Sequence, residues 1–259
     1  GIPMKVRMIC MILLISSISV LSACGSKEKN VEKNDTDVLP LNDSVPGWLE
    51  SFYNSDYEYR KSTFVLENDI EDTIAVVEGK VEASPYKEYV KIVEPAESSW
   101  SEVWFYGDGD DVTAILNIEN DYVLQNTRRF YPYGYGSNLS LSKDRTEEYN
   151  GIPCDVYTAE YTVNLTGQIN QKSGEAIITE PITAVVSQEY YVDPEQDQLL
   201  CMITDASDRQ EKTEIANRVM NDNITVEEAQ KLVSVDEVTK EKMEILSYDD
   251  SISIDIPEI

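Results

Sequence analysis

Over most of its length the chain alternates apolar and polar residues with a period of two, which is the pattern of half-buried β-strands. The alternation begins at residue 57 and continues with few interruptions into the C-terminal tail. Strands with one apolar face must pack that face against another layer, so such a chain has to form a large sheet. The segments that follow this pattern are 57–67, 72–83, 84–93, 101–119, 121–131, 147–165, 182–204 and 242–259.

Short turn signals separate or divide these segments. Gly and Asp fill residues 107–110, Asn150 and Gly151 form a two-residue hairpin signal, and residues 193–195 read Asp-Pro-Glu. Connections this short join strands that are neighbours in the sequence. We therefore expect an antiparallel meander.

Two regions depart from the strand pattern and predict helices. Residues 46–53 gather their apolar residues on one helical side, and Ser44 is a candidate N-cap. Residues 207–233 lack alternation, and their apolar residues fit one helical face. Capping-box patterns begin at Ser207 and at Thr225, so we expect one or two helices inserted before the last strands.

Two strand segments are apolar at successive positions, residues 103–106 and residues 199–203. Such a strand is covered on both faces, or one of its faces lines a cavity. A curved sheet with helices on its concave side accounts for both segments. We therefore expect an α+β fold, mainly antiparallel β, in which a curved meander sheet forms an open half-barrel. Trp104 and Tyr106 are the candidate residues of its groove.

The N-terminal residues have the layout of an export signal. Lys5 and Arg7 precede an apolar run over residues 9–20, which is too short to span a bilayer. Residues 21–24, LSAC, then resemble the bacterial lipobox. This resemblance implies that the chain is cleaved before Cys24 and that acyl chains are attached to this cysteine.

On this interpretation, residues 1–23 are a lipoprotein signal peptide, residues 24–45 a polar flexible tether, and residues 46–259 the folded domain. The protein is then exported and held at the extracytoplasmic face of the cell membrane by its lipid anchor. The alternative is an ordinary cleaved signal peptide that ends beside a chance cysteine.

Charge and composition argue against several kinds of function. The formal net charge of −28 argues against nucleic-acid binding. The chain has no histidine, so it lacks the residues of Ser-His-Asp catalysis and of histidine-ligated zinc. No spacing of acidic residues singles out a catalytic pair. We expect neither an enzyme nor a bound cofactor or metal.

Two cysteines lie within the expected domain, Cys154 and Cys201. Disulfides form readily outside the cytoplasm, so a bridge between them is one interpretation. Two buried thiols on different strands are the alternative, because a free cysteine commonly packs as a small apolar residue.

Residues 128–138, RRFYPYGYGSN, combine arginines, aromatic rings and glycines. Such a loop can gate a groove, or bind a sugar or peptide through stacking and cation–π contacts. The alternative is a tyrosine-rich surface loop that packs on its own sheet edge. The residues of this candidate ligand or partner loop are Arg128, Arg129, Phe130, Tyr131, Tyr133 and Tyr135.

Three further stretches complete the pattern: GIPCDVY at residues 151–157, EYYVDPE at residues 189–195, and ISIDIP at residues 252–257. With the export signal, the meander and the late helices, they resemble the LolA/LolB-like superfamily of envelope proteins. The resemblance implies an unclosed barrel with helices as a lid over an apolar groove, which in relatives accepts acyl chains.

Two functions from different classes follow. The first is a surface-anchored lipoprotein that binds a lipid or acyl chain in a half-barrel groove. The second is a non-catalytic structural or protein-interaction lipoprotein of the envelope, without a small ligand. The sequence does not predict an oligomeric state or a named partner.

Overall fold

The computed structural model describes residues 46–94, 100–108, 111–128, 141–165, 180–234 and 238–259. Its helices are α2 (Gly47–Tyr53), α3 (Ser207–Asp222) and α4 (Val226–Leu232). Its strands are β1 (Tyr57–Glu67), β2 (Ile70–Glu82), β3 (Tyr86–Glu94), β4 (Glu102–Gly107), β5 (Asp111–Ile118), β6 (Asp121–Arg128), β7 (Ser142–Tyr149), β8 (Ile152–Asn164), β9 (Thr183–Asp193), β10 (Gln198–Asp205) and β11 (Val238–Tyr248).

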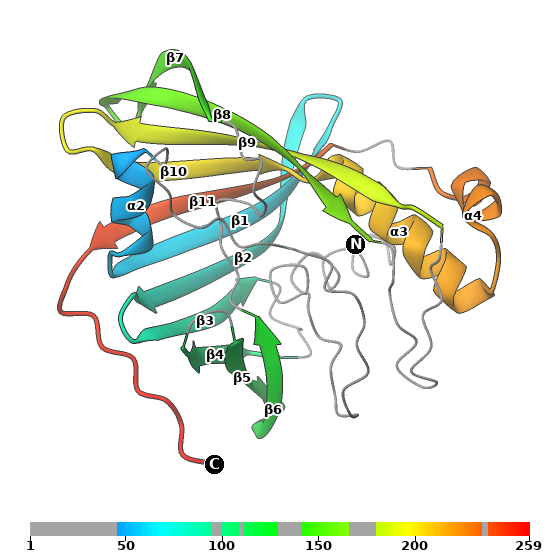
Figure 1. Ribbon diagram of the computed structural model, residues 1–259, viewed down its shortest axis with the longest axis horizontal. Coiled ribbons are helices and arrows are strands. Elements are labelled where there is room, and N and C mark those ends of the chain that lie inside the picture. Colours follow the sequence, from blue (N-terminus) through cyan, green and yellow to red (C-terminus); the bar gives the residue numbers. More distant parts are fainter. Residues whose placement is uncertain (1–45, 95–99, 109–110, 129–140, 166–179, 235–237) are drawn as a thin grey trace.

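All eleven strands form one antiparallel sheet in the order β6-β5-β4-β3-β2-β1-β11-β10-β9-β8-β7. The order consists of two meanders, β1–β6 and β7–β11, which join where β1 pairs with β11. The outermost strands β6 and β7 do not pair with each other in the described residues, so the sheet is open. Figure 1 shows it bent into a trough, which confirms the predicted half-barrel.

Both predicted helical regions lie on one face of this sheet. On β9, alternate residues share a face because the side-chain period of a strand is two. Tyr190 contacts Trp48 of α2. Ile182, which lies eight residues earlier on the same face, packs with Ile215 of α3. The two helices therefore cover the same face, and α2 lies in the hollow of the trough (Figure 1). We call this the concave face.

The predicted turns are confirmed where they are described. Asn150 and Gly151 both have positive φ, 49° and 79°, as a two-residue hairpin of the primed kind requires. The turn after Asp193 joins β9 to β10, whereas residues 109 and 110 of the Gly-Asp turn between β4 and β5 lie outside the described residues.

The helix boundaries confirm one capping box and correct another. Thr225 and Glu228 form the reciprocal bonds of a capping box at the start of α4. The box predicted at Ser207 is wrong, because α3 starts after Ala206 without a side-chain cap. The Ser207 hydroxyl instead donates to Asp205 over 2.7 Å.

Two strand predictions were also wrong. β7 was not expected, because its sequence SKDRTEEY is polar on both faces and almost wholly exposed. The C-terminal tail was expected to add strands, yet residues 249–259 form none. Side chains hold this tail: the backbone N–H of Ile254 donates to Glu82 over 2.7 Å, and Lys87 donates to its carbonyl over 3.2 Å.

Among the described residues, no helix has the length and hydropathy to cross a bilayer. Cys24, the predicted signal peptide and the predicted tether lie outside the described residues, as does the Ser44 cap.

Candidate functional site

The concave face carries a large apolar cluster beneath α2, which we call the α2 cluster. It forms because inward positions on strands from both halves of the sheet are apolar and converge on the buried side of α2. Trp48 lies 5.4 Å from the rings of both Tyr157 and Tyr190. Other members are Leu49, Phe52, Tyr57, Val77, Val90, Val103, Leu116, Val192, Leu199, Met202 and Met243.

The α2 cluster contains a buried polar atom whose hydrogen-bonding capacity is not used. The indole Nε1 of Trp48 has no hydrogen-bond partner among the described residues, although Trp48 is only 2% exposed. A buried N–H without a partner costs roughly 1–3 kcal/mol. This unsatisfied N–H therefore reduces the stability that packing of α2 contributes.

A second apolar cluster, the α3 cluster, occupies the other end of the same face. It joins the late helices to the start of β9. Its buried members are Ile182, Ile215, Ala216, Val219, Val226 and Ala229.

Between the two clusters, four neighbouring strands each place a polar residue on the concave face. Thr63 of β1 pairs with Glu241 of β11, Glu241 with Thr204 of β10, and Thr204 with Gln188 of β9. These four residues, which we call the polar row, are 4%, 9%, 4% and 2% exposed, respectively. Buried polar side chains are kept when they are hydrogen-bonded or when they serve a ligand.

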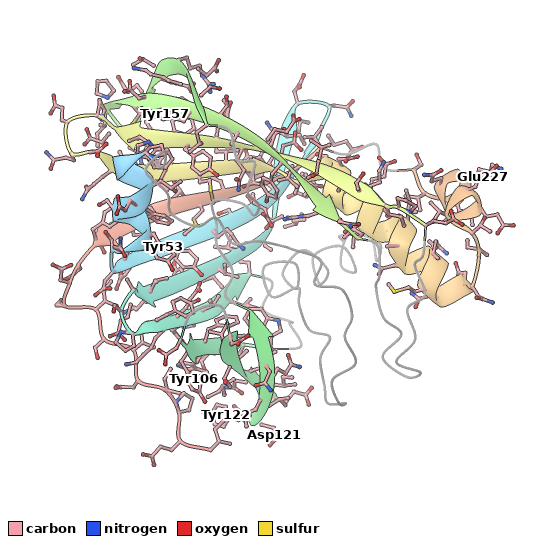
Figure 2. All side chains as sticks on the ribbon, viewed as in Figure 1. Tyr53, Tyr106, Asp121, Tyr122, Tyr157 and Glu227 are labelled. Atoms are coloured by element: carbon pink, nitrogen blue, oxygen red, sulfur yellow. The ribbon has the colours of Figure 1, made fainter. Side chains whose placement is uncertain are left out.

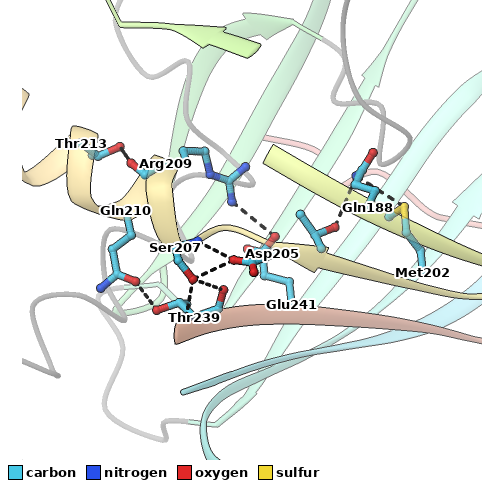
Figure 3. A network of polar contacts seen from close by, with 10 residues as sticks. Gln188, Met202, Asp205, Ser207, Arg209, Gln210, Thr213, Thr239 and Glu241 are labelled. Atoms are coloured by element: carbon cyan, nitrogen blue, oxygen red, sulfur yellow. Dashed lines mark hydrogen bonds and ion pairs between the residues drawn. The ribbon is translucent and has the colours of Figure 1, made fainter. Parts of the chain in front are cut away.

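The polar row is partly satisfied by its own members (Figure 3). Gln188 donates to the Thr204 hydroxyl over 3.3 Å and accepts from the Tyr190 hydroxyl over 2.5 Å. Arg209 of α3 reaches down to Glu241, with 3.4 Å between guanidinium and carboxylate. The side chains of this ion pair are 13% and 11% exposed, so the charges are largely removed from water. The Nε of Arg209 is buried and has no hydrogen-bond partner in the part of the chain that the structure describes.

Lys61 and Tyr161 lie close enough to this ion pair for its charges to act on them. Lys61 lies on the concave face, since its register partners Met243 and Val77 both belong to the α2 cluster. Burial lowers the pKa of Lys61, while the charge of Glu241 acts in the opposite direction. Burial also raises the pKa of Tyr161 to about 12, with smaller contributions from Arg209 and Glu241.

A further carboxylate on the concave face is engaged by hydroxyl groups. Glu88 of β3 accepts hydrogen bonds from Tyr59 over 2.6 Å and from Tyr86 over 2.5 Å, one at each oxygen. Burial, followed by the charge of Glu88, raises the pKa of Tyr59 well above its usual value.

The two predicted groove residues do not line the concave face. Val103 and Phe105 of β4 belong to the α2 cluster, so the intervening Trp104 and the following Tyr106 point to the convex side. Trp104 packs there between the rings of Tyr89 and Tyr122, at 5.4 Å and 6.0 Å. Figure 2 shows Tyr106 and Tyr122 at the end of the sheet formed by β4–β6, away from α2.

The two cysteines are buried free thiols on the convex face, where they pack with Val156 and Tyr191. The structure therefore has the second of the two predicted alternatives. Cys154 lies on β8 and Cys201 on β10, with β9 between them. Strands two apart in a sheet are separated by about 9.5 Å, and a disulfide requires Cα atoms within roughly 7 Å.

The predicted aromatic loop is described only at its first residue, because Arg128 ends β6 and residues 129–140 lie outside the described residues. The described residues contain no group of three or more acidic or thiol side chains that could hold a metal ion.

The polar row was missed in the sequence, although a signal for it exists. On β9 the concave positions read Ala184, Val186, Gln188, Tyr190 and Val192. A glutamine there interrupts an otherwise apolar series.

Comparison with known proteins gives similarity in fold. No protein-family model and no curated protein matches the chain. The lipoprotein LppX of Mycobacterium tuberculosis is 10% identical, and the match covers 82% of this chain and 100% of that one with a TM-score of 0.36. LprF of Mycobacterium bovis is 9% identical over 81% of this chain and 93% of that one, with a TM-score of 0.37.

A LolA superfamily protein of Nitrosomonas europaea is 11% identical, and the match covers 76% of this chain and 89% of that one with a TM-score of 0.26.

Proposed function

We propose that this protein is a non-catalytic, membrane-anchored lipoprotein that binds an apolar ligand, a lipid or acyl chain, on the concave face of its half-barrel. The observation that carries the proposal is the composition of this face. Apolar side chains line it from β5 through β1 to β8, with one buried polar row across the middle.

The size of the α2 cluster relative to α2 supports this proposal. A seven-residue helix is about 10 Å long, whereas neighbouring strands are spaced by about 4.8 Å. The apolar lining reaches Val103 on β4 and Leu116 on β5, far from the strands β8, β9 and β10 that lie beneath α2. Val103 and Leu116 are 0% and 3% exposed, so an acyl chain would replace the groups that now cover this lining, and burial of apolar surface contributes roughly 25 cal/mol per Å².

The position of α2 suits it to move when a ligand enters. It directly follows the predicted tether, and its buried residues are Trp48, Leu49 and Phe52. The unpartnered indole N–H among these three residues lowers the free energy that holds the helix in place.

The test uses the chain from Gly25 onward, which contains every described element and lacks the predicted lipid anchor. The protein is purified from a bacterial host without detergent, and its organic extract is analysed by mass spectrometry. The delipidated protein is then titrated with fatty acids, lysophospholipids and diacylglycerol. We expect a co-purifying lipid and a saturable affinity for at least one of these classes. Clean extracts together with no saturable binding would refute the proposal and favour the protein-interaction alternative.

A further inference from the structure

We propose that two copies of this protein associate through strand β6, which forms an antiparallel pair with β6 of the second copy. The proposal does not depend on a ligand at the concave face, so it goes beyond the proposed function. The observation behind it is a difference between the two edges of the open sheet. β6 has the composition of a strand that accepts another strand, whereas β7 has that of a strand that prevents pairing.

The first step concerns the exposed apolar side chains of β6. Tyr122, Val123 and Leu124 are 43%, 38% and 54% exposed, and Figure 2 shows Tyr122 at the margin of the sheet. Among the described residues, the other exposed large apolar side chains occur singly along the sequence. Consecutive residues of a strand lie on opposite faces, so β6 exposes apolar surface on both faces of this edge. A strand from a second copy would cover both faces at once.

The second step concerns the backbone groups of β6. Glu119 and Asn120 both have positive φ, 52° and 71°, which identifies a two-residue turn between β5 and β6. The flanking residues Ile118 and Asp121 pair with each other. The residues that close such a turn exchange both backbone hydrogen bonds, and this bonding alternates along an antiparallel pair. The odd-numbered residues of β6 therefore bond to β5, and the backbone N–H and C=O groups of its even-numbered residues point outward. In the part of the chain that the structure describes, no strand lies on that side of β6.

The third step concerns the fit of a second copy. A two-fold axis beside Leu124 pairs Leu124 with the same residue of the second copy, and it pairs Tyr122 with Asn126. These residues have outward backbone groups, so each pair forms both hydrogen bonds of an antiparallel ladder. The sequence of β6, DYVLQNTR, has an acidic residue at its start and a basic residue at its end. Antiparallel pairing thus brings oppositely charged ends together, and β6 meets no excess of like charge although the net charge of the chain is −28.

The fourth step concerns the opposite edge of the sheet. β7, SKDRTEEY, carries charged residues on both faces, and its pairing with β8 is irregular between Lys143 and Arg145. Lys143 forms an ion pair with Asp155 at 2.8 Å, and Arg145 forms one with Glu189 at 3.1 Å. Charges and irregularities of this kind prevent pairing at an edge. The association therefore closes as a two-fold dimer and does not extend into a fibre.

The test uses the chain from Gly25 onward and measures its oligomeric state by sedimentation velocity over a series of concentrations. We expect an equilibrium between monomer and dimer. Amide hydrogen exchange, followed by nuclear magnetic resonance, then locates the interface. The amides of Tyr122, Leu124 and Asn126 should exchange about 10-fold more slowly at concentrations where the dimer predominates. The amides of the intervening residues already bond to β5, so their exchange should change less.

The variant that isolates the interface is Leu124→Lys, which places two like charges opposite each other at the two-fold axis. We expect it to weaken the dimer by at least about 10-fold. Leu246→Lys is the matched control, because Leu246 is 55% exposed but lies on β11, in the interior of the sheet order. This control should leave the dimer unchanged.

Three outcomes would overturn the proposal. The first is a wild-type chain that remains monomeric up to about 1 mM. The second is a dimer whose formation leaves the exchange of the outward amides of β6 unchanged. The third is an equal effect of Leu124→Lys and Leu246→Lys on the dimer. The exchange experiment uses the wild-type chain and needs no variant to fold. Lipid binding is measured separately, so a failure of either proposal leaves the other intact.

Discussion

Substitution of Trp48 tests whether α2 is part of the folded core or only rests on it. The side chain is 2% exposed, and a buried tryptophan removes about 200 Å² from water. At about 25 cal/mol per Å², this burial corresponds to roughly 5 kcal/mol, which agrees with the 3–5 kcal/mol typical of Trp→Ala in protein cores. The substitution also removes the unpartnered Nε1, and the loss of this unsatisfied group restores roughly 1–3 kcal/mol of stability. We therefore expect Trp48→Ala to lower the free energy of unfolding by about 2–4 kcal/mol.

The same reasoning makes a sharper prediction for Trp48→Phe. Phenylalanine keeps most of the ring contacts with Tyr157 and Tyr190 and has no N–H to satisfy. The stability lost with the smaller ring and the stability gained by removing the unsatisfied N–H should nearly cancel. We therefore expect a free energy of unfolding within about 1 kcal/mol of wild type.

The assay is urea unfolding of the chain from Gly25 onward, followed by far-ultraviolet circular dichroism so that the loss of a fluorophore does not matter. Trp104→Ala is the matched control, because Trp104 is half-buried on the convex face and its removal should lower the free energy of unfolding by less. If Trp48→Ala leaves stability unchanged, α2 is not packed as described. If Trp48→Phe costs as much as Trp48→Ala, the unpartnered N–H has no energetic importance.

Four further outcomes can be measured on the same protein. Glu241→Gln should lower the free energy of unfolding by about 3–5 kcal/mol in urea titrations, because it leaves its arginine partner charged, buried and unpaired; an unchanged midpoint would contradict this. Gly79→Ala should reduce the melting temperature, since its new Cβ would lie 2.3 Å from the ring of Tyr59; full wild-type stability would show that the ring moves freely. Cys201, whose pKa is raised to about 12 by burial, should resist alkylation at pH 8 until urea unfolds the chain, and rapid labelling of folded protein would refute its burial. The pKa of Tyr161 is raised to about 12, so its contribution to stability should be complete below about pH 10 and disappear as the pH rises through 12; a spectroscopic tyrosine titration that ends by pH 10.5 would contradict it.

Local pattern determined much of this fold. The alternation of apolar and polar residues predicted most strands, because the side-chain period of a strand is two in any sheet. The hairpin at Asn150 and Gly151 was predictable because only certain residues tolerate positive φ at both positions. The late helices were predictable because their sequence changes to a helical period, with a capping box at Thr225.

Tertiary structure decided which face each residue occupies. A shift of one position moves every side chain of a strand to the opposite side, and this register is set by pairing between distant strands. Trp104 therefore lies on the convex face, although its neighbours Val103 and Phe105 are in the α2 cluster. Cys154 and Cys201 are likewise held too far apart for a bridge by the strand that lies between them.

The polar row shows the same difference between what the local sequence and the tertiary structure determine. Thr63, Gln188, Thr204 and Glu241 are spread over 179 positions of sequence, and each alone is one polar residue among others in its strand. Pairing of β1 with β11 joins the two meanders into one sheet and places these four residues in one row. The sequence by itself determined that a curved, one-sided sheet forms, because its chemistry is local. Only the long-range register decided that buried charges meet at the centre of the concave face, because no local interaction specifies which strands become neighbours.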